Sequence, residues 1–373
     1  MNREEIKETI QSCKHCFMCR HACPTFLATK LDSHTPRGYA LLRAEIEAEK
    51  LSWTESVVDR FYQCSQCGLC REDCEYHWQE DELVRQAREE IIAADAVPDR
   101  VKKAADELTN RDDAGAKKLS TLSIAKNSIG KKNPDILFLS GATARIETPE
   151  VLEAAAKLMT AAGSDWAILE REPSAVAGLF ELGYVERAKG EAKKLVSEIE
   201  KLSPKSVVVG CAHQYRAITA YLPRLGVTFP KNIEVIHFTE YLERTIDNGT
   251  LKLKKIDSPS SIGYHDPCHL GRNARILDAP RNIIEAAAGK PPVELFHSRE
   301  AAECCGAGAG MFLTDPDVAQ LVAADRLSGA IADGVETLIT ACPNCTASFR
   351  RAANDRALPI TITDIGAYLV ERI

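Results

Sequence analysis

Hydrophobic positions follow one pattern in the first hundred residues and another in the rest of the chain. In the first part, apolar residues recur at helical spacing around cysteine-rich loops. From residue 134 onward, short apolar runs alternate with helical segments, which is typical of an α/β region. The helices expected in the first part span residues 6–11, 39–49, 56–62, 82–92 and 98–110. The strands expected in the second part span 136–140, 166–169, 207–209, 262–264, 293–296 and 337–340.

The polar stretch 111–133 contains Gly115 and Gly130 and predicts a linker between these parts. A chain of 373 residues also exceeds what one hydrophobic core usually supports. We therefore expect an α+β multidomain protein, with a helical unit over residues 1–100, a linker over 101–133, and α/β units over 134–250 and 251–373.

Composition and charge narrow the possible partners. The net charge of -7 gives no electrostatic reason to bind nucleic acid or an anionic membrane surface. No apolar run is long enough to span a membrane, and the first residues have no apolar signal core. We expect a cytoplasmic protein without a transmembrane anchor of its own, associated with a membrane at most through a partner subunit.

Fourteen cysteines without a secretion signal indicate metal or redox chemistry, because the cytosol keeps thiols reduced. The first eight form two runs with the C-x₂-C-x₂-C-x₃-C spacing of bacterial ferredoxins, in which the fourth cysteine ligates the other cluster. One 4Fe-4S cubane is therefore assigned to Cys13, Cys16, Cys19 and Cys74, and the second to Cys64, Cys67, Cys70 and Cys23. Two structural zinc sites are the alternative, although zinc does not need this triple spacing.

A second group of cysteines lies near the C-terminus: Cys268, Cys304, Cys305, Cys342 and Cys345. Five thiolates exceed the four that a cubane needs. This excess indicates either an unusual cluster with a shared ligand or a cluster beside a reactive thiol. The Cys342-Pro-Asn-Cys345 turn alone could be a thioredoxin-like dithiol, but its neighbours favour a cluster. Glycines 306, 308 and 310 would allow the backbone to approach it.

A weak internal duplication relates the two halves of the α/β region. Glu303 precedes Cys342 by 39 residues, and Glu172 precedes Cys211 by the same 39. In the first copy, Ala142, Pro173, Ser174 and Gln214 stand where ligand thiols would be, and Cys211 alone remains. Cys211 follows a strand and opens a helix, a position that lowers a thiol's pKa and makes it reactive. The alternative is a buried remnant of a lost cluster site.

With these motifs, the chain resembles the family of cysteine-rich CCG-domain proteins. This family includes the B-type and D-type components of heterodisulfide reductase, the K-type component of the sulfite-reduction membrane complex, and the iron-sulfur subunits of glycolate oxidase and anaerobic glycerol-3-phosphate dehydrogenase. The resemblance implies a ferredoxin-like domain followed by two CCG domains. It also implies a further, noncubane 4Fe-4S cluster on Cys268, Cys304, Cys305, Cys342 and Cys345. Because the first motif is incomplete, reduction of a heterodisulfide through two paired clusters is not expected.

Two functions remain open. In the first, the chain is an oxidoreductase of the heterodisulfide reductase type, in which the C-terminal site acts on a thiol or disulfide. In the second, it is a non-catalytic relay between a flavin dehydrogenase and a quinone or cytochrome. The expected partners are a flavoprotein, a membrane cytochrome b or a thiol carrier. His265 and His269 flank Cys268, and they could pass protons or hydrogen-bond to sulfur, as could His213.

Overall fold

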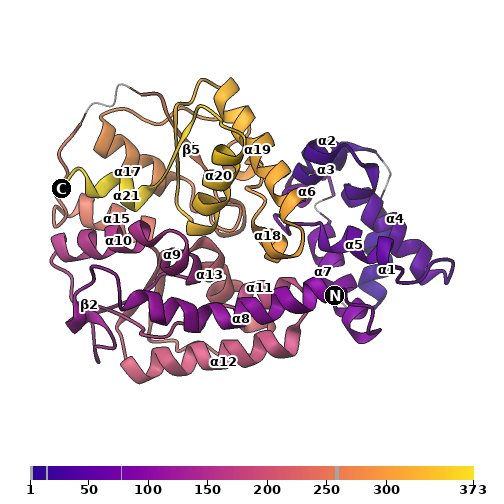
Figure 1. Ribbon diagram of the computed structural model, residues 1–373, viewed down its shortest axis with the longest axis horizontal. Helices are drawn as coiled ribbons and strands as arrows, with labels where there is room; N and C mark the ends of the chain where they lie inside the picture. Colours follow the sequence, from indigo (N-terminus) through magenta and orange to yellow (C-terminus); the bar gives the residue numbers. More distant parts are fainter. Residues whose placement is uncertain (1–2, 14–15, 77, 257–259) are drawn as a thin grey trace.

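The computed structural model describes residues 3–13, 16–76, 78–256 and 260–373. Figure 1 shows a small helical unit, drawn in indigo and violet, beside a larger body that holds two parallel sheets. The orange helices of the C-terminal part lie between the helical unit and the rest of the chain (Figure 1). The expected mixed architecture of helices and parallel sheets is present.

Short helices separated by cysteine-bearing loops form the N-terminal unit. Thr35 caps α4 by accepting a hydrogen bond from the Gly38 amide, and Pro36 occupies the first helical turn, where no amide donor is needed. The ranges predicted near residues 6–11, 39–49, 56–62 and 82–92 correspond to α1, α4, α5 and α7. The elements are α1 (Arg3–Ser12), α2 (Met18–Ala22), α3 (Pro24–Thr29), η1 (Asp32–His34), α4 (Pro36–Glu47), α5 (Glu55–Tyr62), α6 (Leu69–Asp73) and α7 (Glu80–Ala93).

Helix α8 (Asp99–Leu119) corrects the predicted linker. It continues through residues 111–119 and packs against α9 (Ala142–Ile146) of the first sheet unit. Gly115, which favoured a loop in the sequence, lies inside this helix, where an added Cβ would come 3.1 Å from the Arg145 side chain. The glycine therefore allows close packing of helix and side chain, and a short 3-10 turn, η2 (Lys126–Ser128), completes the segment.

The first sheet has the order β2-β1-β3-β4, with all strands parallel. Strand β4 pairs with β3 and lies outside the predicted strands, because it begins with the exposed Glu234 and only its last two residues, Ile236 and His237, are buried. The elements of this unit are β1 (Ile136–Leu139), α9 (Ala142–Ile146), α10 (Pro149–Ala161), β2 (Trp166–Ile168), α11 (Val176–Glu181), α12 (Val185–Leu202), β3 (Ser206–Val209), α13 (Ala212–Arg216), η3 (Ala217–Tyr221), α14 (Leu222–Arg224), β4 (Glu234–His237) and α15 (Phe238–Asp247).

The second sheet is parallel as well, with the order β5-β6-β7. The strand predicted over 293–296 is wrong: Val293 makes a single bridge to Gly263, and Phe296 is 84% exposed. The elements are β5 (Ile262–His265), α16 (Gly271–Ala274), α17 (Asp278–Ala288), η4 (Arg299–Ala301), η5 (Gly308–Gly310), α18 (Met311–Thr314), α19 (Pro316–Ala332), β6 (Thr337–Thr340), α20 (Pro343–Asp355), β7 (Thr361–Asp364) and α21 (Ile365–Val370).

The strand orders of the two units correspond. Strands β1, β3 and β4 take the same order as β5, β6 and β7, and the Val293 bridge beside β5 takes the place of β2 beside β1. Cys211 follows β3 and caps α13, just as Cys342 follows β6 and caps α20. The register seen in the sequence therefore has a counterpart in the fold.

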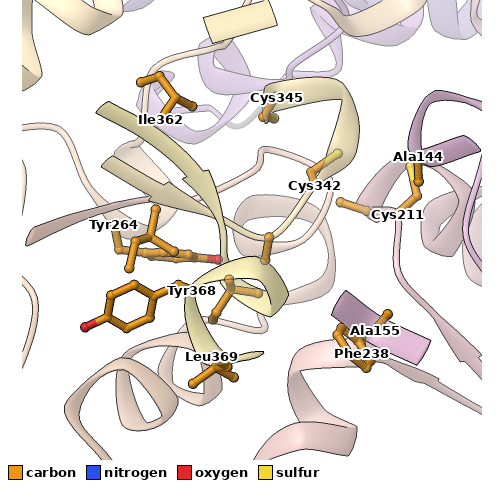
Figure 2. Packing of buried hydrophobic residues seen from close by; sticks show 14 of the residues in the cluster. Ala144, Ala155, Cys211, Phe238, Tyr264, Cys342, Cys345, Ile362, Tyr368 and Leu369 are labelled. Carbon is orange, nitrogen blue, oxygen red and sulfur yellow. The ribbon is translucent and has the colours of Figure 1, made fainter. Parts of the chain in front are cut away.

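The units share their hydrophobic cores. One face of the first sheet, with Phe138 and Val208, packs into a cluster that also contains Tyr264 and Phe349 of the second unit. Figure 2 shows part of this cluster, with Phe238 of the first unit on one side and Tyr368 and Leu369 of the second on the other. The opposite face of the first sheet packs against aromatic residues of the N-terminal helices, so the positions of all three units are fixed by buried apolar contacts.

Within the described ranges, no helix is long and apolar enough to cross a membrane.

Candidate metal centres

Four cysteines from distant parts of the N-terminal unit line one cavity. Cys23, Cys64, Cys67 and Cys70 surround a space of about 380 Å³, and these are the four residues predicted to share one cubane. Burial raises the pKa of Cys23 and Cys70, and raises that of Cys64 to about 12. Thiols held in this way ionise only when a cation is bound beside them. This donor set fits a thiolate-ligated iron cluster.

The other predicted cubane site lies nearer the surface. Burial raises the pKa of Cys19 to about 11, with contributions from Cys13 and Cys16, so these three sulfurs are neighbours. Cys16 is exposed. Helix α2 contacts α6, which ends one residue before Cys74. The assignment of Cys74 as the fourth ligand stays a prediction.

The five C-terminal cysteines are all buried and lie in contact with one another. The Sγ atoms of Cys345 and Cys305 are 3.2 Å apart. Cys304 contacts both Cys268 and Cys305, and Cys342 contacts Cys345. The fold thus brings together sulfurs that lie up to 77 residues apart in the sequence, from Cys268 to Cys345. Soft thiolates gathered in this way are the ligands that iron-sulfur clusters use.

Neighbouring sulfurs extend beyond this group in both directions. Cys304 shares a buried cluster with Cys67, which lines the N-terminal cavity. At the other end, Cys342 shares a buried cluster with Cys211 of the first sheet unit. Figure 2 shows Cys211 and Cys342 as neighbours on elements of the two units. A series of neighbouring cysteines therefore joins the N-terminal unit, the second sheet unit and the first.

Backbone and side-chain contacts fix the meeting point of Cys67 and Cys304. The Cys304 Sγ donates to Ser65 Oγ at 3.3 Å, and a Cβ at Gly308 would come 2.2 Å from the Ser65 carbonyl oxygen. The buried Arg272 guanidinium donates to the Cys67 carbonyl oxygen at 2.8 Å. It also donates to the carbonyl oxygens of Glu300 and Ala302, close to Cys304. One side chain thus ties the two cysteine loops together.

The prediction that Cys211 has a lowered pKa is wrong. The amides of His213 and Gln214 at the start of α13 do favour the thiolate, as expected for a helix N-terminus. Contact with Cys342 and complete burial outweigh them and raise the pKa of Cys211. Its neighbours Cys211 and Cys345 lower the pKa of Cys342.

His265 lies beside sulfurs of the C-terminal group. Its ring is buried and edge-on to Phe349 with centroids 4.7 Å apart, and a ring nitrogen lies within 4.8 Å of the Cys305 and Cys345 sulfurs. Burial lowers the pKa of His265, which favours the neutral imidazole. Among the described residues, neither ring nitrogen of His265 has a hydrogen-bond partner, whereas Nδ1 of His269 lies at hydrogen-bond distance, 3.9 Å, from the Cys268 Sγ atom.

His213 and His269 both lie beside a buried carboxylate, that of Glu181. Their Nε2 atoms are 2.9 and 3.2 Å from its oxygens, and Tyr221 Oη donates to it at 2.7 Å. Burial opposes ionisation of Glu181, but the two histidines outweigh it and keep its pKa well below the usual range.

Two histidines and a glutamate could suggest a separate metal site. Arg216 excludes it, because its guanidinium donates to Nδ1 of His269 at 2.9 Å. Nδ1 then carries no proton, and Nε2, which must carry it, cannot ligate a metal.

Several of these residues carry weak signals in the sequence. Glu181 ends an otherwise apolar helix, which could have marked it as a buried acid. Arg272 lies in the short helix α16 and Ser65 in a loop, and nothing in the sequence links Arg272 to Cys67 or Ser65 to Cys304. Arg88 is fully buried and donates to the carbonyl oxygens of Cys64 and Glu181, and it likewise could not be identified from its neighbours.

Comparisons with known proteins agree with this arrangement. Residues 9–78 match the 4Fe-4S dicluster domain family, and residues 262–350 match the cysteine-rich domain family CCG. The second range holds all five C-terminal cysteines and does not include the first sheet unit.

Relatives cover most of the chain. The D-type component of the dihydromethanophenazine:CoB–CoM heterodisulfide reductase of Methanosarcina barkeri is 26% identical over 392 residues, covering 98% of this chain and 94% of that protein. The EtfAB:quinone oxidoreductase of Syntrophomonas wolfei is 23% identical over 90% of this chain and 54% of its own length. The probable iron-sulfur-binding oxidoreductase FadF of Bacillus subtilis is 32% identical over 51% of this chain and 26% of its own length.

Proposed function

The chain combines a 4Fe-4S dicluster domain with a cysteine-rich CCG domain and is a distant relative of the D-type component of heterodisulfide reductase and of similar iron-sulfur oxidoreductases. On this basis we propose that it is an iron-sulfur oxidoreductase subunit that connects two N-terminal cubanes with a C-terminal cluster, where it carries out thiol/disulfide chemistry. The proximity of Cys67 to Cys304 carries this proposal, because the two share a buried cluster and the Cys304 Sγ lies 3.3 Å from Oγ of Ser65, two residues before Cys67. Ligands of two different centres that lie side by side allow electrons to pass between them without an intervening carrier.

Under this proposal, Cys13, Cys16, Cys19 and Cys74 hold one cubane, and Cys23, Cys64, Cys67 and Cys70 hold the other. Cys268, Cys304, Cys305, Cys342 and Cys345 hold a further 4Fe-4S cluster of noncubane type. When bound, these clusters supply one-electron carriers. Arg272 and Ser65 keep the two cysteine loops in contact, and His265 lies beside the sulfurs of Cys305 and Cys345.

We also propose that residues 134–250 are a degenerate copy of the C-terminal unit over 251–373, with residues 1–100 as the dicluster unit. The shared strand order and the matching positions of Cys211 and Cys342 support this division. The copy lacks the thiols that a second cluster would need.

The alternative is a relay that passes electrons from a flavoprotein to a quinone or a membrane cytochrome b. Similarity to a relative named as an EtfAB:quinone oxidoreductase supports it. We favour the reductase, because the heterodisulfide reductase component is covered along nearly its whole length, whereas the quinone oxidoreductase is covered over about half.

A reduction assay separates the two. The anaerobically purified protein, reduced with a viologen, is mixed with a small disulfide or with a soluble quinone, and viologen oxidation is followed. If the protein is a reductase, the disulfide oxidises the viologen. The Cys304→Ala variant should lose this disulfide-dependent oxidation, while its N-terminal cubanes can still be reduced. Reduction of quinone alone would establish the relay instead.

A further inference from the structure

A cleft lies where the first sheet unit lacks its cluster thiols. Its space is about 490 Å³, part of it open to solvent, and it is lined by residues of both units. Ala142, Ser174 and Gln214, which stand at ligand positions of the complete motif, form part of its wall. Side chains without a thiol at these positions leave the space beside Cys211 open to a small molecule.

The cleft leads to the series of neighbouring cysteines. Cys211 lines it, and Figure 2 shows Cys211 beside Cys342 of the C-terminal group, in the same buried cluster. Asn344, within the Cys342–Cys345 turn, lines the opposite wall. A molecule in the cleft would therefore approach the C-terminal site from the side of Cys342, away from the N-terminal unit that meets it at Cys304.

One wall of the cleft is fixed by buried hydrogen bonds. His213 lines the cleft, and its Nε2 is held at 2.9 Å by the buried Glu181 carboxylate. The Gln214 side chain donates to the Pro173 carbonyl oxygen at 3.1 Å. The cleft is therefore preformed, and a ligand need not order these side chains on binding.

The rim of the cleft is balanced in charge. Arg111 lines it, but this guanidinium is paired with Glu147 and Glu107, and it lies over the ring of Phe312. Recognition at the rim therefore does not depend on a charged ligand. Leu108 and Phe312 add apolar surface, so the cleft suits a small, weakly polar molecule.

We infer that this cleft is the substrate site and that it takes a low-molecular-weight disulfide or thiol, whose sulfur lies against Cys211 and Cys342. This inference rests on the proposed reductase function and adds the location of the substrate site. Electrons reach the C-terminal site at Cys304, and the substrate reaches it at the opposite end through the cleft of the degenerate unit.

Alkylation of Cys211 tests the inference without measuring turnover. Cluster-loaded protein is treated anaerobically with iodoacetamide, and modification of Cys211 is followed by peptide mass spectrometry. We expect Cys211 to react slowly, because it is only 4% exposed, and oxidised 2-mercaptoethanol, a neutral disulfide, to slow the reaction further by occupying the cleft. Ala142→Leu fills the cleft and should slow alkylation about tenfold, as a close-packed side chain excludes the reagent.

A matched control makes the same chemical change elsewhere. Ala161→Leu lies at the exposed end of α10 and should leave Cys211 alkylation and disulfide reduction unchanged. Phe312→Trp narrows the cleft from the second unit and should act in the same direction as Ala142→Leu, which covers the case in which that variant does not fold.

The outcomes distinguish the two proposals. If the protein reduces the disulfide and the cleft-filling variants reduce it equally fast, the cleft is not the substrate site although the reductase function stands. If the disulfide protects Cys211 but is never reduced, the cleft binds it and the reductase function is wrong. Alkylation of Cys211 that neither the disulfide nor either cleft variant slows would overturn the inference.

Discussion

Arg272 is the side chain whose removal should most affect the junction between the two cysteine loops. It is 2% exposed and donates to the carbonyl oxygens of Cys67, Glu300 and Ala302. In Arg272→Met, these buried carbonyl groups lose a charged donor. Each such hydrogen bond contributes about 1.5–3 kcal/mol, and because the losses are not additive we expect a total of about 3–5 kcal/mol.

Urea unfolding of the cluster-loaded protein under anaerobic conditions measures this cost. With a slope of about 3 kcal/mol per molar urea, the transition midpoint should fall by about 1 M or slightly more. Visible absorbance reports the clusters and tryptophan fluorescence the protein. Re-oxidation of the N-terminal cubanes by a disulfide should slow in the same variant, because the loop that carries Cys67 is no longer held against Cys304.

Arg275→Met is the matched control. Arg275 lies three residues further along and also bridges the units, through Glu72 at 2.9 Å, but its side chain is 53% exposed. Exposed ion pairs contribute about 0–1 kcal/mol, so a small shift is expected. Equal shifts in the two variants would refute the role given to Arg272.

Three further predictions concern other parts of the chain. Gly306→Ala should prevent loading of the C-terminal cluster while both cubanes load, because Gly306 has φ +81° and its Cβ would meet the Ala319 carbonyl oxygen at 2.3 Å; Gly334→Ala, with φ +80° and open space, should load all three. Burial raises the pKa of Asp112 to about 7, above its value of about 4 in the unfolded chain. The folded state therefore binds this proton more tightly, and the stability that the protonated carboxyl contributes is fully present below about pH 4 and is lost as the pH rises through about 7. Asp112→Asn keeps the acceptor for Ser174 and should reduce the decline in unfolding free energy between about pH 5 and about pH 8, and an unchanged decline would contradict this. His265→Phe removes the imidazole that lies beside the Cys305 and Cys345 sulfurs and should lower the reduction potential of the C-terminal cluster in a titration followed by electron paramagnetic resonance, with the cubane potentials as internal controls; an unaltered potential would show that this imidazole does not act on the cluster.

Local patterns identified most of the elements that position the cysteines. Apolar runs such as residues 136–139 and 207–209 are buried strands, and both are the near-continuous hydrophobic runs expected of strands in parallel sheets. Strand β7 (Thr361–Asp364) was missed because polar residues alternate along it and only two of its four residues are buried. Val293 and its neighbours look like a strand in composition, yet Phe296 is exposed. Composition alone does not show whether a sheet has room for another strand.

The arrangement of the site depends on contacts between distant residues, and the sequence could not predict it. The spacing of the cysteines indicates which of them form groups, but not that Cys67 lies in one buried cluster with Cys304 or that Cys211 lies beside Cys342. The cleft beside Cys211 also depends on packing, because both α/β units and helix α8 contribute to its walls. For the same reason, the effect of the helix N-terminus on Cys211 was predicted with the correct sign but was outweighed by a neighbour from the other unit.

Metal content tests the central claim most directly. Iron and acid-labile sulfide are measured per chain in anaerobically purified protein, for the wild type and for Cys304→Ala. Three clusters of four irons predict about twelve irons per chain in the wild type and about eight in the variant. Zinc in place of iron, or about eight irons already in the wild type, would contradict the account, because the C-terminal cysteines would then hold no cluster.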